Sequence, residues 1–139
     1  MALGCLAGML ALGAARAADQ DTLTIHATGF ANARGHAIAK LYQPGDDVLG
    51  PGRWQSTATI VNGQARFVFS GLPRGRYAAV AFHDENDSGS IDHNALGVPS
   101  EAIGFSNGFA LGLLSGLPRF DKLRFEYSGE TQRIEIVVK

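Results

Sequence analysis

The residues best suited to chemistry lie between positions 84 and 95, in the stretch DENDSGSIDHNA. Oxygen-bearing side chains alternate there, and Gly89 follows the third of them. This spacing matches the calcium loop of the EF-hand, in which alternate oxygens converge on one point as the chain curls. The residues that fit the loop are Asp84, Asn86, Ser88, Asp92 and, through its main-chain carbonyl, Ser90. The spacing therefore predicts a cation site, with Ca²⁺ as the ion.

The loop lacks the last ligand of an EF-hand. The twelfth position, where the EF-hand has a bidentate glutamate, is Ala95, and the residues before Asp84 read as a strand rather than a helix. A replacement ligand must come from elsewhere, and the candidates are Asp87, Asn94 and Glu101. The loss of one bidentate carboxylate predicts weak binding, with a Kd of about 10⁻⁴ to 10⁻³ M.

The charge pattern around this loop favours a cation. No lysine or arginine occurs from Tyr77 to Pro118, although five carboxylates lie in that segment. A divalent ion would relieve their mutual repulsion. Asp, Asn, Ser and Gly are also the ordinary turn-forming residues, so a solvated turn without any ion is the alternative interpretation.

His83 and His93 flank the same loop and open a second possibility. Imidazole nitrogens with Asp84 or Asp92 suit Zn²⁺ or Cu²⁺, as in a small periplasmic hydrolase or a metal-handling protein. Otherwise the sequence argues against catalysis. It has no H-E-x-x-H and no phosphate-binding glycine loop, and its one cysteine, Cys5, lies in the N-terminal apolar run. We therefore predict a protein that is not an enzyme.

Strands must position these residues, because apolar and polar side chains alternate along most of the chain. The predicted strands cover residues 22–30, 36–43, 55–61, 64–72, 77–82, 122–129 and 132–139. Asn62-Gly63 predicts a tight hairpin turn, and residues 77–82 are apolar on both faces, as in a central strand. These features predict a single domain, residues 18–139, folded as an antiparallel β-sandwich of about seven strands. Its long loop, residues 84–120, contains at most short helical turns.

A second candidate site is apolar. Phe105, Asn107 and Phe109 lie in a glycine-rich segment, and Trp54 lies in a separate loop rich in proline and glycine. These residues either pack as core or form an exposed patch that binds a partner. We expect that partner to be an envelope protein or a glycan. A net charge of −1 argues against nucleic acid.

The N-terminal segment predicts export. Residues 1–17, MALGCLAGMLALGAARA, form a short apolar run that ends in the small-x-small pattern of a signal peptide. Cleavage there gives a mature chain that starts at Ala18 and is periplasmic or secreted. The run is too short to span a bilayer comfortably, so no membrane span is expected after its removal.

The central segment resembles a family of small exported bacterial proteins, domain of unknown function 2141. The resemblance is carried by GLPRGRYA at 71–78, by HDENDSGSIDHN at 83–94 and by GVPSEAIGFSN at 97–107. It implies an exported protein with a prealbumin-like sandwich. It implies no catalytic residue.

Overall fold

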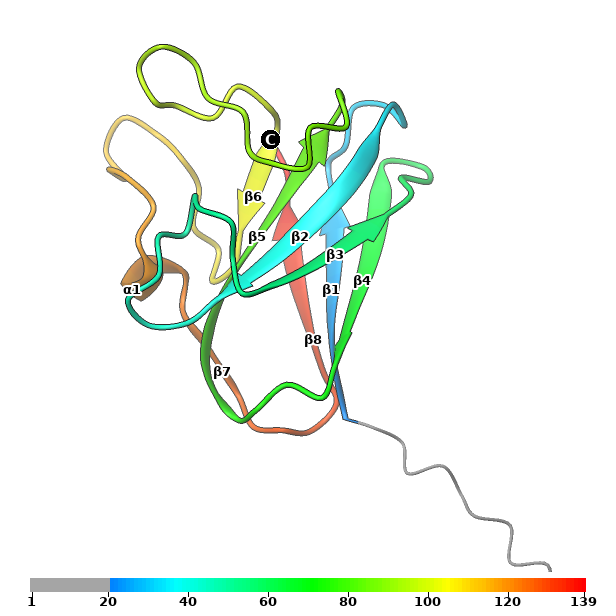
Figure 1. Ribbon diagram of the computed structural model, residues 1–139, viewed down its shortest axis with the longest axis vertical. Coiled ribbons are helices and arrows are strands. Elements are labelled where there is room, and N and C mark those ends of the chain that lie inside the picture. Colours follow the sequence, from blue (N-terminus) through cyan, green and yellow to red (C-terminus); the bar gives the residue numbers. More distant parts are fainter. Residues whose placement is uncertain (1–20) are drawn as a thin grey trace, which may run out of the picture.

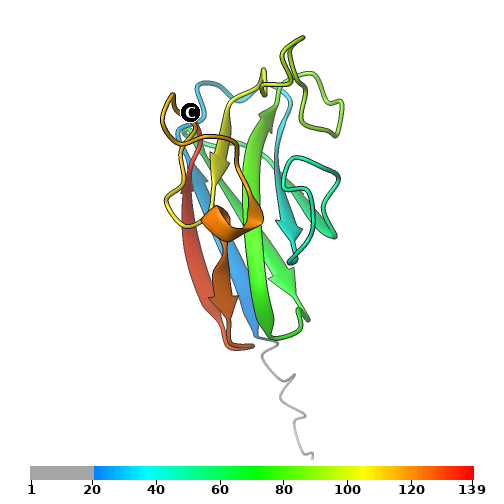
Figure 2. The same ribbon diagram turned by 90° about the vertical axis from the view of Figure 1, so that its left-hand side faces the viewer.

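The computed structural model describes residues 21–139, which form two β-sheets packed face to face (Figures 1 and 2). The elements, in chain order, are β1 (Thr22–Thr28), β2 (His36–Tyr42), β3 (Trp54–Ala58), β4 (Gln64–Ser70), β5 (Gly75–Asp84), β6 (Ile103–Phe105), α1 (Phe120–Leu123), β7 (Phe125–Tyr127) and β8 (Gln132–Val137). The all-β sandwich is confirmed. The predicted signal peptide lies outside the described residues.

The smaller sheet has the order β4-β1-β8. β1 and β4 are antiparallel, and their alternating apolar residues face the core, as in the pair Ile25 and Phe67. β1 and β8 are parallel, which differs from the purely antiparallel sandwich that we predicted. These are the first and last strands, so no hairpin connects them and local sequence does not set their relative direction.

The larger sheet has the order β3-β2-β5-β6, and β7 pairs with another part of β5. β5 is the central strand and is buried on both faces from Tyr77 onward, as predicted. Its face with Ala79 and Ala81 packs against the smaller sheet. Its other face, with Val80 and Phe82, is covered by Val48, Ile91 and the α1 residues Phe120 and Leu123.

The predicted turn at Asn62-Gly63 forms. Both residues have positive φ values, 51° and 70°, and Val61 and Gln64 exchange main-chain hydrogen bonds of 2.9 and 3.0 Å. The strands on either side nevertheless belong to different sheets. The turn therefore joins the two sheets at one edge of the sandwich, and it does not form a hairpin within one sheet.

The other edge is built around β6, a strand of three residues that the alternation pattern did not predict. Ser106, just after it, donates its main-chain N–H to the Ala79 carbonyl and accepts a hydrogen bond from Ala79 N–H at its hydroxyl oxygen. The same hydroxyl donates to the Leu123 carbonyl at 2.6 Å. This side chain thus fills the gap on β5 between β6 and β7.

β5 and β6 also hold the two ends of the long loop that contains the predicted cation site. Asp84 is the last residue of β5, and Ile103 is the first residue of β6. The N–H of His83 donates to the carbonyl of Ala102 at 2.9 Å, which brings the ends together. Two loops, 85–102 and 106–119, project from this side of the molecule, which faces the viewer in Figure 2.

Candidate cation site

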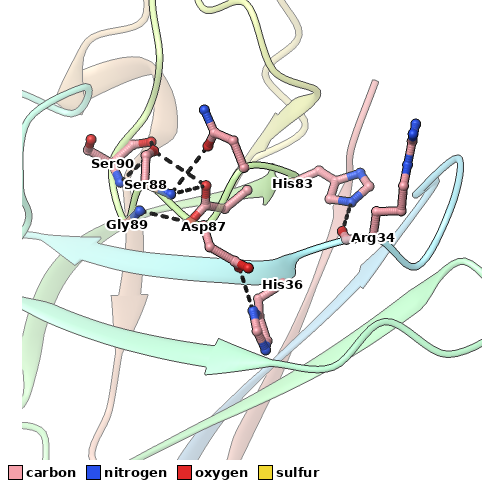
Figure 3. Close-up of polar contacts among 9 residues, drawn as sticks. Arg34, His36, His83, Asp87, Ser88, Gly89 and Ser90 are labelled. Atoms are coloured by element: carbon pink, nitrogen blue, oxygen red, sulfur yellow. Dashed lines mark hydrogen bonds and ion pairs between the residues drawn. The ribbon is translucent and has the colours of Figure 1, made fainter.

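Asp84 organises the first part of the loop. Its side chain is at the end of a buried strand, and the residue is only 2% exposed. Its two carboxylate oxygens accept main-chain hydrogen bonds from Ser88 at 3.0 Å and Gly89 at 2.8 Å (Figure 3). Gly89 has a φ of +76°, a conformation that glycine adopts without steric cost. The chain therefore curls around this carboxylate.

Several oxygens converge on the Ser88 hydroxyl. Its oxygen lies 3.3 Å from Asp84 Oδ1, 3.4 Å from Asp92 Oδ1 and 3.0 Å from the Ser90 carbonyl. The side-chain NH₂ group of Asn86 donates a hydrogen bond to Asp92 Oδ2 at 2.7 Å. The loop thus brings together the five residues whose spacing predicted a cation site.

The separations between these oxygens suit a common metal ion. Oxygen ligands lie about 2.4 Å from Ca²⁺, so two neighbours that subtend about 80° are about 3.1 Å apart. The Ser88 hydroxyl has one proton and can donate it to only one of its three neighbours at a time. The remaining close oxygen pairs have no proton between them, and a cation would stabilise them.

Ile91 fixes the loop to the sandwich. It is 6% exposed and packs in the cluster that covers the outer face of β5. The two neighbours of Ile91, Ser90 and Asp92, point their oxygens toward Ser88. The apolar side chain thus orients both of these groups.

Glu101 returns to the loop through a short hairpin. His93 and Pro99 form a β-bridge, and the N–H of Ser100 donates to the Asp92 carbonyl at 2.8 Å. The Glu101 Oε2 atom is buried and has no hydrogen-bond partner among the described residues. Burial raises the pKa of the Glu101 carboxyl, the main-chain N–H of Asp92 lowers it, and the negative charges of Asp92 and Asp84 raise it further. An unpaired carboxylate oxygen therefore lies near the convergent set.

The donor set is mixed in chemistry. Within residues 21–139, no group of three His, Cys, Asp or Glu side chains is placed to hold a metal ion. The oxygens around Ser88 come instead from two carboxylates, a hydroxyl and a main-chain carbonyl, with one amide beside them. With two formal negative charges, such a set suits a weakly held hard cation.

Two of the predicted substitute ligands are engaged elsewhere. Asp87 Oδ1 is 2.7 Å from His36 Nδ1 (Figure 3), and Asn94 Oδ1 accepts the main-chain N–H groups of Leu96 and Val98. Glu85 lies 3.3 Å from Arg34. Basic partners from outside the acidic segment therefore offset part of its charge, which the pattern along the chain did not reveal.

The two histidines do not join the oxygens around Ser88. His83 is 1% exposed, its Nε2 is 2.7 Å from the Arg34 carbonyl (Figure 3), and its ring packs edge-on against Phe30. Strand alternation places it on the opposite face of β5 from Asp84. His93 is exposed on the hairpin. The arrangement of histidine and aspartate that a zinc or copper site needs is thus not formed.

The residues of the predicted apolar patch do not form one exposed surface. Phe105 is buried and packs edge-on against the half-buried Phe109, at 5.3 Å between ring centres. Asn107 donates to the Lys122 carbonyl at 3.1 Å, and Trp54 packs on Tyr77 at the edge of the main core. The exposed apolar side chains nearby are leucines of the same glycine-rich segment: Leu111, Leu113, Leu114 and Leu117. The absence of any charged residue from Ala102 to Pro118 is the signal that points to them.

None of the helices in residues 21–139 has the length and apolar character needed to cross a membrane. No curated protein and no solved structure matches the chain. The model of one protein family does match, over residues 25–135, and that family is described as uncharacterized protein conserved in bacteria (DUF2141). This description assigns no activity, and nothing in the described residues indicates catalysis. Because the match covers most of the chain and includes the loop and both strands that hold it, the protein belongs to this bacterial family.

Proposed function

We propose that this protein is an exported, non-enzymatic β-sandwich module whose loop 84–95 is ordered by Ca²⁺, and that it binds an envelope protein or a glycan. The main support for a bound cation is the crowding of oxygens around Ser88. Its hydroxyl oxygen is within 3.4 Å of three acceptor oxygens but has one proton for them.

The donor chemistry favours calcium over other common metals. The groups around the Ser88 hydroxyl are oxygens, which suit Ca²⁺ and Mg²⁺ rather than zinc or copper. A loop of several residues with carboxylate, hydroxyl and carbonyl donors suits the variable geometry of Ca²⁺ better than the strict octahedron of Mg²⁺. Glu101 would complete the set with its unpaired Oε2 atom.

The binding role rests on the hairpin that the loop carries. Residues 93–99 project beyond the sandwich, and Leu96 and Val98 are 87% and 46% exposed. A bound cation would fix the base of this hairpin and so reduce the entropy that a partner must overcome. Mature protein incubated with an envelope extract should therefore retain a partner in calcium and release it in EDTA. The same retained material under both conditions would contradict a cation-dependent binding role.

The cation itself is tested by thermal unfolding. An ion that binds only the folded state at about ten times its Kd adds about 1.4 kcal/mol, which corresponds to about 4 to 8 °C in Tm for a domain of this size. We expect that rise with calcium relative to EDTA. Asp92→Asn should abolish it, because the substitution removes one of two charges while conserving side-chain size.

Asp87→Asn is the matched control, since Asp87 faces His36 and not the oxygen cluster. It should retain the full response to calcium. Isothermal titration on the same variants separates binding from any loss of stability. Identical melting curves in calcium and EDTA for the unmutated protein would show that the segment is a turn without an ion.

A further inference from the structure

The loop that follows β6 ends in an apolar tip. Leu113 and Leu114 are 106% and 101% exposed, as much as in an extended peptide, so no other part of the described chain covers them. Leu111 and Leu117 beside them are 39% and 69% exposed. Exposed leucines concentrated at one projecting point indicate an interaction surface.

Several backbone groups on either side of this tip have hydrogen-bond partners within the protein. The N–H of Gly112 donates to the Ser115 hydroxyl at 2.8 Å, and that hydroxyl lies 3.0 Å from the Gly112 carbonyl. The Lys122 ammonium donates to the carbonyls of Ser115 at 2.6 Å and Leu117 at 3.2 Å. Internal hydrogen bonds of this kind lower the cost of moving these backbone groups into lipid, because hydrocarbon offers no partners.

The shape of the tip also favours lipid over a protein partner. Leu113 and Leu114 project outward from the turn that joins Gly112 and Ser115. A rigid protein surface would need a complementary pocket for them, and most of the binding energy at protein interfaces comes from aromatic and arginine side chains. A fluid bilayer accepts a protruding aliphatic tip without a preformed pocket.

Charge changes sharply behind the tip. No charged residue occurs from Ala102 to Pro118, and the next six residues contain three basic side chains and one acid, Asp121. The basic residues Arg119, Lys122 and Arg124 are all exposed. Basic groups just above an apolar insertion are attracted to anionic headgroups, and long basic side chains extend toward the interface.

We infer that the loop 110–117 inserts its leucine tip into the surface of an anionic lipid bilayer and holds the folded domain against it. The contact needs no cation at the acidic loop. It is therefore independent of the proposed function, and EDTA should leave it unchanged.

Tryptophan fluorescence tests the insertion at the tip itself. Trp54 is the single tryptophan of the chain, so Leu114→Trp in a Trp54→Phe background reports from the tip alone. Vesicles of phosphatidylcholine and phosphatidylglycerol should shift its emission to shorter wavelength, and vesicles of phosphatidylcholine alone should shift it less. The matched control is Val61→Trp in the same background. Val61 is 62% exposed near the turn between β3 and β4, at the opposite edge of the sandwich in Figure 1. Its emission should not change.

If Trp54→Phe disturbs folding, sedimentation with vesicles can measure lipid binding in protein that retains Trp54. Leu113→Ser with Leu114→Ser should lower the lipid partition coefficient about a hundredfold, because each buried leucine contributes about a tenfold factor. Two results would overturn the inference: an unchanged spectrum at position 114 with both vesicles, or equal shifts at positions 114 and 61. A shift that follows protein concentration without lipid would instead identify the tip as a contact between two copies.

Discussion

Glu101 is the residue that would complete the proposed cation site. Its Oε2 atom is buried beside Asp84 and Asp92 without a hydrogen-bond partner, so the carboxylate is available to an ion. Ala95, which has the sequence position of the missing EF-hand glutamate, is exposed in the turn of the 93–99 hairpin. The residue that we propose as the substitute ligand lies six residues later, after the hairpin has reversed the chain.

This geometry predicts different effects of two substitutions on calcium affinity. Glu101→Gln should weaken calcium binding by about tenfold, equivalent to about 1.4 kcal/mol, because the ion loses a charged ligand. Ala95→Glu should leave the affinity unchanged, since the hairpin directs that position away from the site. Isothermal titration of calcium measures both. Tighter binding by Ala95→Glu would show that the loop curls as a complete EF-hand and that the hairpin opens.

At the scale of single residues, the spacing within the acidic loop could be used to predict the converging oxygens. The contacts between residues far apart in the sequence could not be predicted. Alternation of Asp84, Asn86 and Ser88 with glycine at position 89 is enough to predict converging oxygens, because the curl depends only on neighbouring residues. The contact between Asp87 and His36 joins residues 51 positions apart. It depends on the register of β2 against β5, which places His36 opposite Asp84, and no local pattern specifies that register.

At the scale of elements, β6 is the short strand on which both projecting loops depend. It lies between them in the chain, pairs with β5 and contacts the end of β8 across the edge of the sandwich. The two main-chain hydrogen bonds between Ile103 and Lys139, both 3.1 Å, join the sheets there. Gly104 permits this approach, because a Cβ atom at that position would lie 2.3 Å from the Val137 carbonyl oxygen and 2.6 Å from an Ile136 methyl group.

Gly104→Ala should therefore destabilise the domain by about 1 to 3 kcal/mol or more, through overpacking against backbone that has no room to move. Gly112→Ala is the control, because a Cβ atom there meets only the Ser115 hydroxyl at 3.9 Å. Urea unfolding of both variants gives the comparison. Equal stabilities would mean that β6 and β8 lie farther apart than the structure shows.

Most elements could be predicted because their strands alternate or are apolar on both faces. Residues 22–28, 64–70 and 132–137 show period two, and β5 reads as a central strand. β6 has only three residues, too few for a period, and the polar Ser106 continues its pairing through a side chain. The parallel alignment of β1 and β8 likewise follows from the closure of the whole sandwich and not from either strand alone.

On the scale of the whole molecule, the sandwich presents two different loops on one side. The 85–102 loop is acidic and rich in oxygen donors, and the 106–119 loop is uncharged up to Arg119 and ends in leucines. Both leave the same edge of the larger sheet, before and after β6, with α1 below them (Figure 2). A domain held to lipid by one loop would present the other loop next to the membrane surface, where envelope proteins and glycans are concentrated.

Such a location requires export, which leads to a prediction on the whole chain. β1 begins at Thr22, whose register partner is Ser70 at the end of β4. Cleavage after Ala17 would therefore leave every strand of residues 21–139 in the mature chain. Intact-mass measurement on protein from an envelope fraction should give a chain that starts at Ala18. Ala15→Arg with Ala17→Arg should block cleavage, because signal peptidase accepts small residues at these two positions. Unprocessed chain starting at Met1 in most of the unmutated protein would show that residues 1–17 are not a cleaved signal.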